Sequence, residues 1–81
     1  MIDNNIVNST LAQIEEKHKV RILKIMGGKS AQLRLAGMGI IPGKEIEMIR
    51  NSKQGPIIIG NNSNKIMLGR GLAQKIFVEA Q

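Results

Sequence analysis

Hydrophobic and polar residues alternate in parts of the chain, and this period of two is typical of β-strands with one buried face. The clearest case is residues 44–50, in which Glu45 and Glu47 alternate with Ile46 and Met48. Short apolar stretches predict four more strands, at residues 20–26, 57–59, 65–68 and 76–78. In the first of these the alternation breaks at residues 23 and 24, which predicts a bulge or bend.

One stretch between the first two strands has a helical character. Residues 31–36 contain no β-branched residue and no proline, so they predict a short helix over 30–37 with Ser30 as its N-cap. A glycine-rich corner follows, where a glycine can end the helix at positive φ and a Pro-Gly pair can turn into the next strand. The residues of this structural corner are Gly37, Gly39, Pro42 and Gly43. A second helical turn is expected at 69–75, before the last strand.

These elements predict a small all-β (mainly β) protein, a strongly bent barrel of five strands with one helix inserted after the first. Closure of the barrel would place the last strand beside the first. With 81 residues the chain can form one domain, which we expect over residues 11–81. Residues 1–10 are polar and rich in asparagine, so we expect them to form a flexible N-terminal segment.

The chain is basic, with a formal net charge of +6, and could attract nucleic acid, an anionic membrane surface or an acidic protein. Phe77 is the only aromatic residue, which argues against a platform on which nucleic-acid bases could stack. Apolar runs are short and broken by charge, so we expect no membrane insertion. Residues 1–5 lack the basic and apolar regions of a signal peptide, so a cytoplasmic location is expected.

Nothing in the sequence predicts a catalytic, cofactor or metal site. There is no cysteine, and the single histidine, His18, stands between Lys17 and Lys19, whose charges repel a cation. The corner superficially resembles a phosphate-binding loop, but its order is helix to strand and Glu45 stands where a hydroxyl would bind magnesium. We therefore expect a protein that is not an enzyme and that binds no cofactor.

Residues 34–48, RLAGMGIIPGKEIEM, resemble the signature of the FeoA family. Flanking segments extend the resemblance over about residues 11–78, although GRG at 69–71 departs from the family pattern and weakens the last helical turn. FeoA proteins are small bacterial proteins that accompany the ferrous-iron transporter FeoB. A looser version of the signature occurs in the C-terminal domain of DtxR-type metalloregulators. The resemblance implies a Src-homology-3-like (SH3-like) barrel.

The resemblance also implies a function. We expect an accessory or regulatory protein of ferrous iron uptake that binds the cytoplasmic part of FeoB, either its GTPase region or a membrane-proximal part. One alternative is a detached DtxR-type C-terminal domain that acts in metal-dependent transcription regulation. A nucleic-acid-binding module, which would use the positive charge, is a third class that a salt-dependent affinity for duplex DNA or RNA would reveal.

The helix and its corner form the only substantial element outside the strands, so we expect them to project from the barrel and to carry the partner surface. Leu35 should plug the barrel, whereas Leu33 stays partly exposed. The expected partner-binding residues are Arg34, Met38, Ile41 and Lys44. Ile58 and Phe77 should point outward from their strands, where they could support a weak homo-oligomer.

Overall fold

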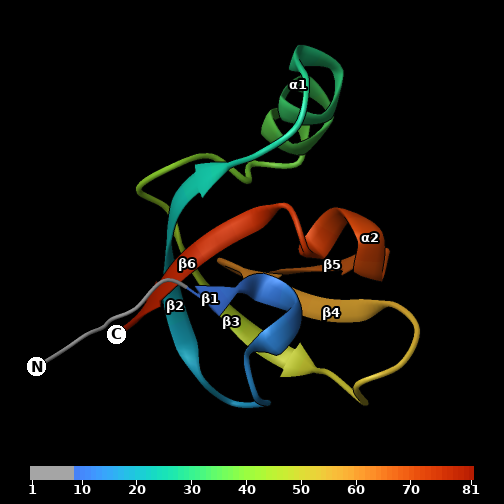
Figure 1. The fold of residues 1–81 in the computed structure, drawn as a ribbon. Helices are drawn as coiled ribbons and strands as arrows, with labels where there is room; N and C mark the ends of the chain where they lie inside the picture. The colour runs from blue at the N-terminus through green and yellow to red at the C-terminus, as the bar shows by residue number, and fades with distance from the viewer. Residues whose placement is uncertain (1–8) are drawn as a thin grey trace, which may run out of the picture.

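The computed structural model describes residues 9–81, which form one antiparallel sheet and three short helical elements (Figure 1). The strands are β1 (Ser9–Thr10), β2 (Lys19–Ile25), β3 (Glu45–Arg50), β4 (Ile57–Asn61), β5 (Asn64–Leu68) and β6 (Ile76–Ala80). The helical elements are the 3-10 helix η1 (Leu11–Gln13) and the α-helices α1 (Lys29–Gly37) and α2 (Arg70–Ala73). The strand order is β1-β6-β2-β3-β4-β5.

The sheet curls around one hydrophobic core, to which strands β2 to β6 contribute side chains that mostly alternate along the chain. The largest fully buried side chains are Leu11, Val20, Ile22, Leu35, Ile40, Met48, Ile57, Ile59, Leu68, Ile76 and Val78. As predicted, β6 pairs with β2. Strands β1 and β5 form the two edges of the sheet, so the barrel is not strictly closed. The prediction of a small, mainly β, strongly bent architecture is confirmed.

A bulge helps the sheet to curl at the predicted place. The pairing register between β2 and β6 shifts between Ile22 and Lys24, which is where the alternation breaks in the sequence. A second shift, between Met48 and Arg50, lies in the pairing of β3 with β4. Each bulge adds local twist, which lets short strands wrap around a small core.

Two details of the prediction need correction. Ser9 and Thr10, assigned to the N-terminal segment, form β1, which pairs with Val78 and Phe77 of β6. The sheet therefore has six strands rather than five; the rest of the segment expected to be flexible lies outside the described residues. The N-cap of α1 is Gly28 rather than Ser30, because the amide of residue 32 already donates to the Gly28 carbonyl at 3.2 Å.

The glycine corner has the predicted conformation, with Gly39 as the glycine that ends the helix at positive φ. Gly37 is the last residue of α1 and does not have positive φ, whereas Gly39 and Gly43 have φ values of 82° and 92°. The backbone therefore reverses after Met38, the C-cap, and turns again after Pro42, as the Pro-Gly pair predicts.

Asn51 holds the N-terminal part of the domain against the barrel. It is buried, and its side-chain nitrogen donates to the carbonyls of Ala12 and Ile14 at 2.9 and 2.8 Å. Arg70 of α2 donates to the side-chain oxygen of Asn51 at 2.7 Å and to the Ala12 carbonyl at 3.2 Å. A third hydrogen bond, from Arg70 Nε to the Gly55 carbonyl at 2.9 Å, connects α2 to the β3–β4 loop. These contacts fasten η1, the β3–β4 loop and α2 to one another.

Candidate functional site

Helix α1 projects from the barrel, as Figure 1 shows, and it is held mainly by one side chain. Leu35 is the buried residue of the helix, and it enters the core as predicted. Ile40, which follows the helix, is also fully buried. Leu33 remains 65% exposed. Because α1 buries so little of its surface in the domain, most of it is free to contact another molecule.

A groove of about 480 Å³ lies between α1, the end of β2 and the glycine corner. We call it the α1 groove, and it is lined by Lys24, Ile25, Lys29, Gln32, Leu33, Ala36, Ile41 and Pro42. Its volume is within the range of pockets that accept side chains or small molecules. Most of its lining side chains are apolar, and its two charged residues are both lysines.

Backbone hydrogen bonds fix the corner that forms one wall of the groove. The amide of Gly43 donates to the Ile22 carbonyl at 2.7 Å, and the Ile22 amide donates to the Lys44 carbonyl at 2.9 Å. The side-chain nitrogen of Asn61, at the end of β4, donates to the Met38 carbonyl at 3.2 Å. The corner is therefore attached to two strands, and the groove is formed before any partner arrives.

Of the four residues predicted to bind a partner, one lines the α1 groove. Ile41 is 47% exposed and lines the α1 groove. Met38 is half-buried, because it packs against the core cluster. Arg34 is exposed on α1 and Lys44 is half-buried in the corner, but neither lines the groove. They do not all line one cavity.

Sequence reasoning missed the lysines of the groove. Lys29, Leu33 and Ala36 follow one another at spacings of four and three, which places them on one side of a helix. That signal was available in the sequence. The contribution of Lys24 was not, because it depends on how β2 leads into α1.

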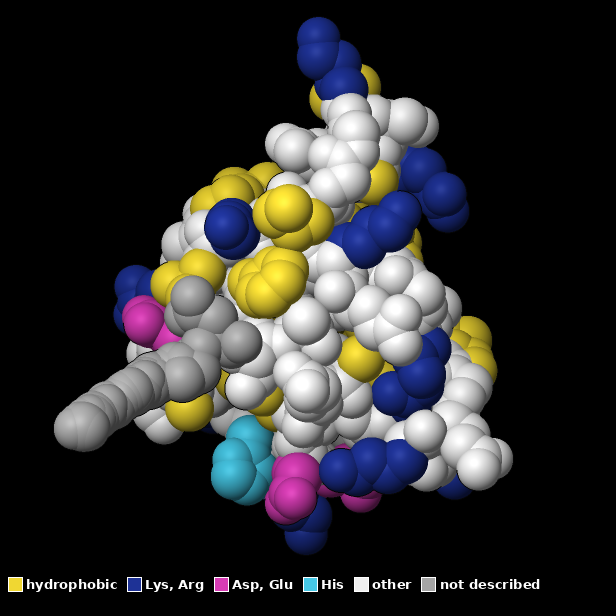
Figure 2. All heavy atoms as spheres, viewed as in Figure 1, with side chains coloured by type: hydrophobic (Ala, Val, Ile, Leu, Met, Phe, Trp, Pro, Cys, Tyr) yellow, Lys and Arg dark blue, Asp and Glu magenta, His cyan; other side chains and the backbone are white. Residues whose placement is uncertain are grey.

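Charge and apolar surface come together at the α1 end of the molecule. In Figure 2, apolar and basic side chains share the surface at and below α1, whereas the acidic side chains visible in this view lie on the barrel. The described residues contain a single ion pair, between Arg21 and Glu45 at 3.3 Å. The lysines of the α1 groove thus have no carboxylate partner within the described part of the chain.

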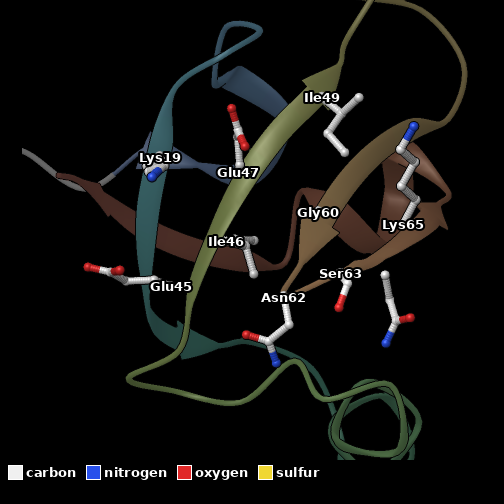
Figure 3. Close-up of a pocket in the computed structure, with 10 residues that line it drawn as sticks. Lys19, Glu45, Ile46, Glu47, Ile49, Gly60, Asn62, Ser63 and Lys65 are labelled. Atoms are coloured by element: carbon white, nitrogen blue, oxygen red, sulfur yellow. The ribbon is translucent and has the colours of Figure 1, made fainter.

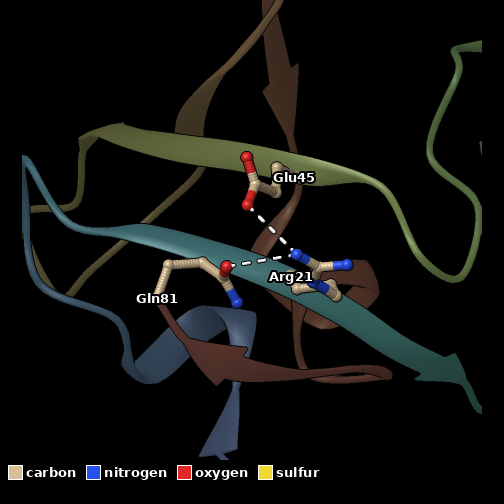
Figure 4. Close-up of polar contacts among 3 residues, drawn as sticks. All are labelled: Arg21, Glu45 and Gln81. Carbon is tan, nitrogen blue, oxygen red and sulfur yellow. Dashed lines mark hydrogen bonds and ion pairs between the residues drawn. The ribbon is translucent and has the colours of Figure 1, made fainter.

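The Arg21–Glu45 pair lies on the outside of β2 and β3 (Figure 4). Arg21 also donates to the Gln81 side chain at 3.3 Å, which joins the C-terminus to these strands. Both charged side chains are about half exposed, so solvent screens the pair and its contribution to stability is small.

A second hollow, of about 300 Å³, lies on the outer face of β3 and the β4–β5 hairpin (Figure 3). Lys19 and Lys65 face it together with Glu45 and Glu47. Because both signs of charge are present, the hollow has no clear preference for an anion or a cation. It is a weaker candidate for a binding site than the α1 groove.

Ile58 and Phe77, the residues predicted to support a homo-oligomer, lie on strands that β2 and β3 separate in the sheet. Ile58 is half-buried and pairs across strands with Met67, which is 67% exposed on the edge strand β5. Phe77 is half-buried, and the Lys24 ammonium lies 5.7 Å from its ring centroid. The two residues therefore belong to separate surfaces, and self-association through them stays a prediction.

His18 is exposed, and it lies beside acidic side chains at the end of the molecule opposite α1 (Figure 2). Over residues 9–81, no group of three or more histidine, cysteine, aspartate or glutamate side chains is arranged to hold a metal ion. Ferrous iron usually needs two histidines and a carboxylate.

We therefore expect this protein to have no specific binding site for ferrous iron. Anaerobic calorimetry with Fe²⁺ should show no one-to-one binding tighter than about micromolar, because one exposed imidazole flanked by lysines is a weak ligand. His18→Ala should behave like the unmodified protein in the same titration. A stoichiometric, tight isotherm that His18→Ala abolishes would contradict this expectation.

Within residues 9–81, no helix is long and apolar enough to cross a membrane.

Known proteins resemble this chain in sequence and in fold. The FeoA domain family matches residues 9–80. The chain is 45% identical over 69 residues to "Putative Fe(2+) transport protein A" of Methanocaldococcus jannaschii. The aligned residues cover 85% of this chain and 83% of that protein. The crystal structure of the iron uptake regulatory protein FeoA superposes with a TM-score of 0.87 at 29% identity, over 93% of this chain and all of that one. These matches confirm the resemblance and the SH3-like fold.

A manganese-dependent transcriptional repressor has the same fold in part of its chain. Its TM-score is 0.85 at 17% identity, and the match covers 98% of this chain but 45% of the repressor. At this identity the likeness concerns the fold alone.

Proposed function

The chain belongs to the FeoA domain family, and from this membership we propose that it is an accessory protein of ferrous iron transport that binds the cytoplasmic part of the FeoB transporter. The observation that carries the proposal is the 45% identity to a protein named for Fe(2+) transport over 85% of this chain. The protein would act in the cytoplasm as a binding partner and not as an enzyme.

The proposed partner surface is the α1 end of the molecule. Ile41 and Leu33 expose large apolar side chains there, and such side chains gathered on one surface are typical of protein-contact sites. Arg34, Met38 and Lys44, expected from the sequence to contact the partner, surround this end and would contribute a charged and apolar margin. The positive charge of this margin would favour an acidic surface on FeoB.

A pull-down from the native membrane and cytosolic fractions tests the proposal. The immobilised protein should recover FeoB from the membrane fraction, and Ile41→Glu should recover much less while keeping its thermal stability, because Ile41 is already 47% exposed. Equal recovery of FeoB by both baits would place the surface elsewhere. Absence of FeoB from both eluates would count against the transport role.

The alternative expected from the sequence is a detached domain of a DtxR-type metalloregulator, and the matched 45% of a manganese-dependent repressor shares its fold with this chain. The same pull-down distinguishes the two functions. Recovery of a winged-helix repressor that lacks its own barrel domain, in place of FeoB, would support the alternative.

A further inference from the structure

We propose that the α1 groove receives an acidic segment of FeoB that inserts one or two large aliphatic side chains between α1 and the corner. This inference rests on the proposed function and narrows it to one site and one kind of occupant. Its three supports are the shape of the groove, its charge and its rigidity.

The shape suits aliphatic side chains. Leu33 and Ile41 face the groove from opposite walls, α1 and the corner, and Ile25 extends the lining from β2. Large hydrophobic side chains that remain exposed within residues 9–81 are few, namely Met26, Leu33, Ile41 and Met67. Two of them line the groove, and Met26 directly follows a third lining residue. Exposed apolar surface concentrated in this way marks a site of interaction.

The charge selects the occupant. Lys24 and Lys29 line the groove, and a third cation, Lys75, lies next to Gly27 at the base of α1. No glutamate lines the groove, and the single ion pair of the described residues is elsewhere. A basic segment would be repelled, whereas a carboxylate beside an aliphatic side chain would complement both the lysines and the apolar lining.

The rigidity favours binding without rearrangement. Gln32 donates from its side-chain nitrogen to the carbonyls of Ile25 and Gly27, each at 3.4 Å, which attaches α1 to the end of β2. The Met26 amide donates to the Lys75 carbonyl at 2.7 Å, which attaches the end of β2 to the turn before β6. Hydrogen bonds therefore connect both walls of the groove to the sheet, which reduces the conformational entropy that is lost when the segment enters.

Matched pairs of variants test the inference by titration against the purified cytoplasmic part of FeoB. Leu33→Glu is compared with Met67→Glu, since these side chains are 65% and 67% exposed but only Leu33 lines the groove. Lys24→Glu is compared with Lys19→Glu, since both residues are exposed on β2 but only Lys24 lines the groove. Thermal melts establish that all four variants are folded.

We expect each groove variant to raise the dissociation constant by about 30-fold or more, as for central interface residues. The two control variants should stay within about threefold of the unmodified protein. As an uncharged test, Ala36→Trp should also weaken binding, because its ring would fill the groove from α1.

The inference is overturned if Leu33→Glu and Lys24→Glu bind FeoB as tightly as their controls. The proposed function would still stand in that case, because the unmodified protein binds. Loss of binding in Arg34→Glu or Lys44→Glu alone would place the site outside the α1 groove and would contradict the inference. If the groove variants lose affinity for phosphatidylglycerol vesicles but keep it for FeoB, the groove is a lipid site and the inference is wrong. No binding of the unmodified protein would instead remove the proposed function itself.

Discussion

Replacing Asn51 by leucine is expected to lower the free energy of unfolding by about 3 kcal/mol or more, because each buried polar group left without a partner costs about 1–3 kcal/mol. The leucine cannot donate to the carbonyls of Ala12 and Ile14, nor can it accept from Arg70. The backbone amide of Lys53, which donates to the Asn51 side chain at 3.0 Å, also loses its acceptor. In a domain of this size such a loss is a large share of the total stability.

Urea denaturation at constant ionic strength measures this loss. Asn64→Leu serves as the control, because Asn64 is an exposed asparagine on the edge strand β5, and its replacement should change the stability little. Asn51→Asp, which keeps an acceptor for Arg70 but loses both donations, should fall between the two. An unchanged midpoint for Asn51→Leu would show that the network around Asn51 contributes little to stability.

The second large effect is expected at the glycine corner, where Gly39→Val should destabilise the domain more than Gly43→Val. Both glycines have positive φ, which a β-branched residue adopts at a cost of about 1–3 kcal/mol. At Gly43 an added side-chain carbon would meet nothing within 4 Å. At Gly39 it would lie 2.7 Å from the side-chain nitrogen of Asn61, which is 6% exposed.

The collision at Gly39 has a further consequence. To move away, Asn61 must give up its hydrogen bond to the Met38 carbonyl, and it has little room because it is buried. We expect this loss to add about 1 kcal/mol or more to the strain. The comparison of the two valine variants by thermal melting isolates this contact from the backbone effect. Equal destabilisation would contradict the role assigned to Asn61.

Much of the fold could be predicted because the strands follow the alternation of apolar residues. Ile46 and Met48 are buried as expected, and the corner glycines Gly39 and Gly43 have the predicted conformation. Strand β1 could not be predicted, because Ser9 and Thr10 have no apolar pattern and form a strand by pairing with β6. Its stability comes from a neighbour almost 70 residues away in the chain.

The sequence pattern also could not predict hydrogen bonds between polar residues that lie far apart in the chain. The helical turn predicted at 69–75 is present as α2, over Arg70–Ala73, although Gly69 and Gly71 weaken it. Arg70 donates to three groups outside α2, which adds tertiary support that helix propensity does not include.

The sequence predicted that the helix and the corner project from the barrel, but it did not predict the groove that they form with β2. The burial of Leu35 and the exposure of Leu33 follow from helical geometry. The groove itself combines α1 with the end of β2 and the corner, so Lys24 enters it only through the tertiary structure. Met38 is partly covered for a similar reason, since the corner folds back onto the core.

The most direct test of the proposed function is a titration of the unmodified protein against the purified cytoplasmic part of FeoB, repeated with full-length FeoB in nanodiscs. We expect saturable one-to-one binding with a dissociation constant of about 10 μM or tighter. No saturable binding to either form of FeoB at concentrations up to about 1 mM would contradict it.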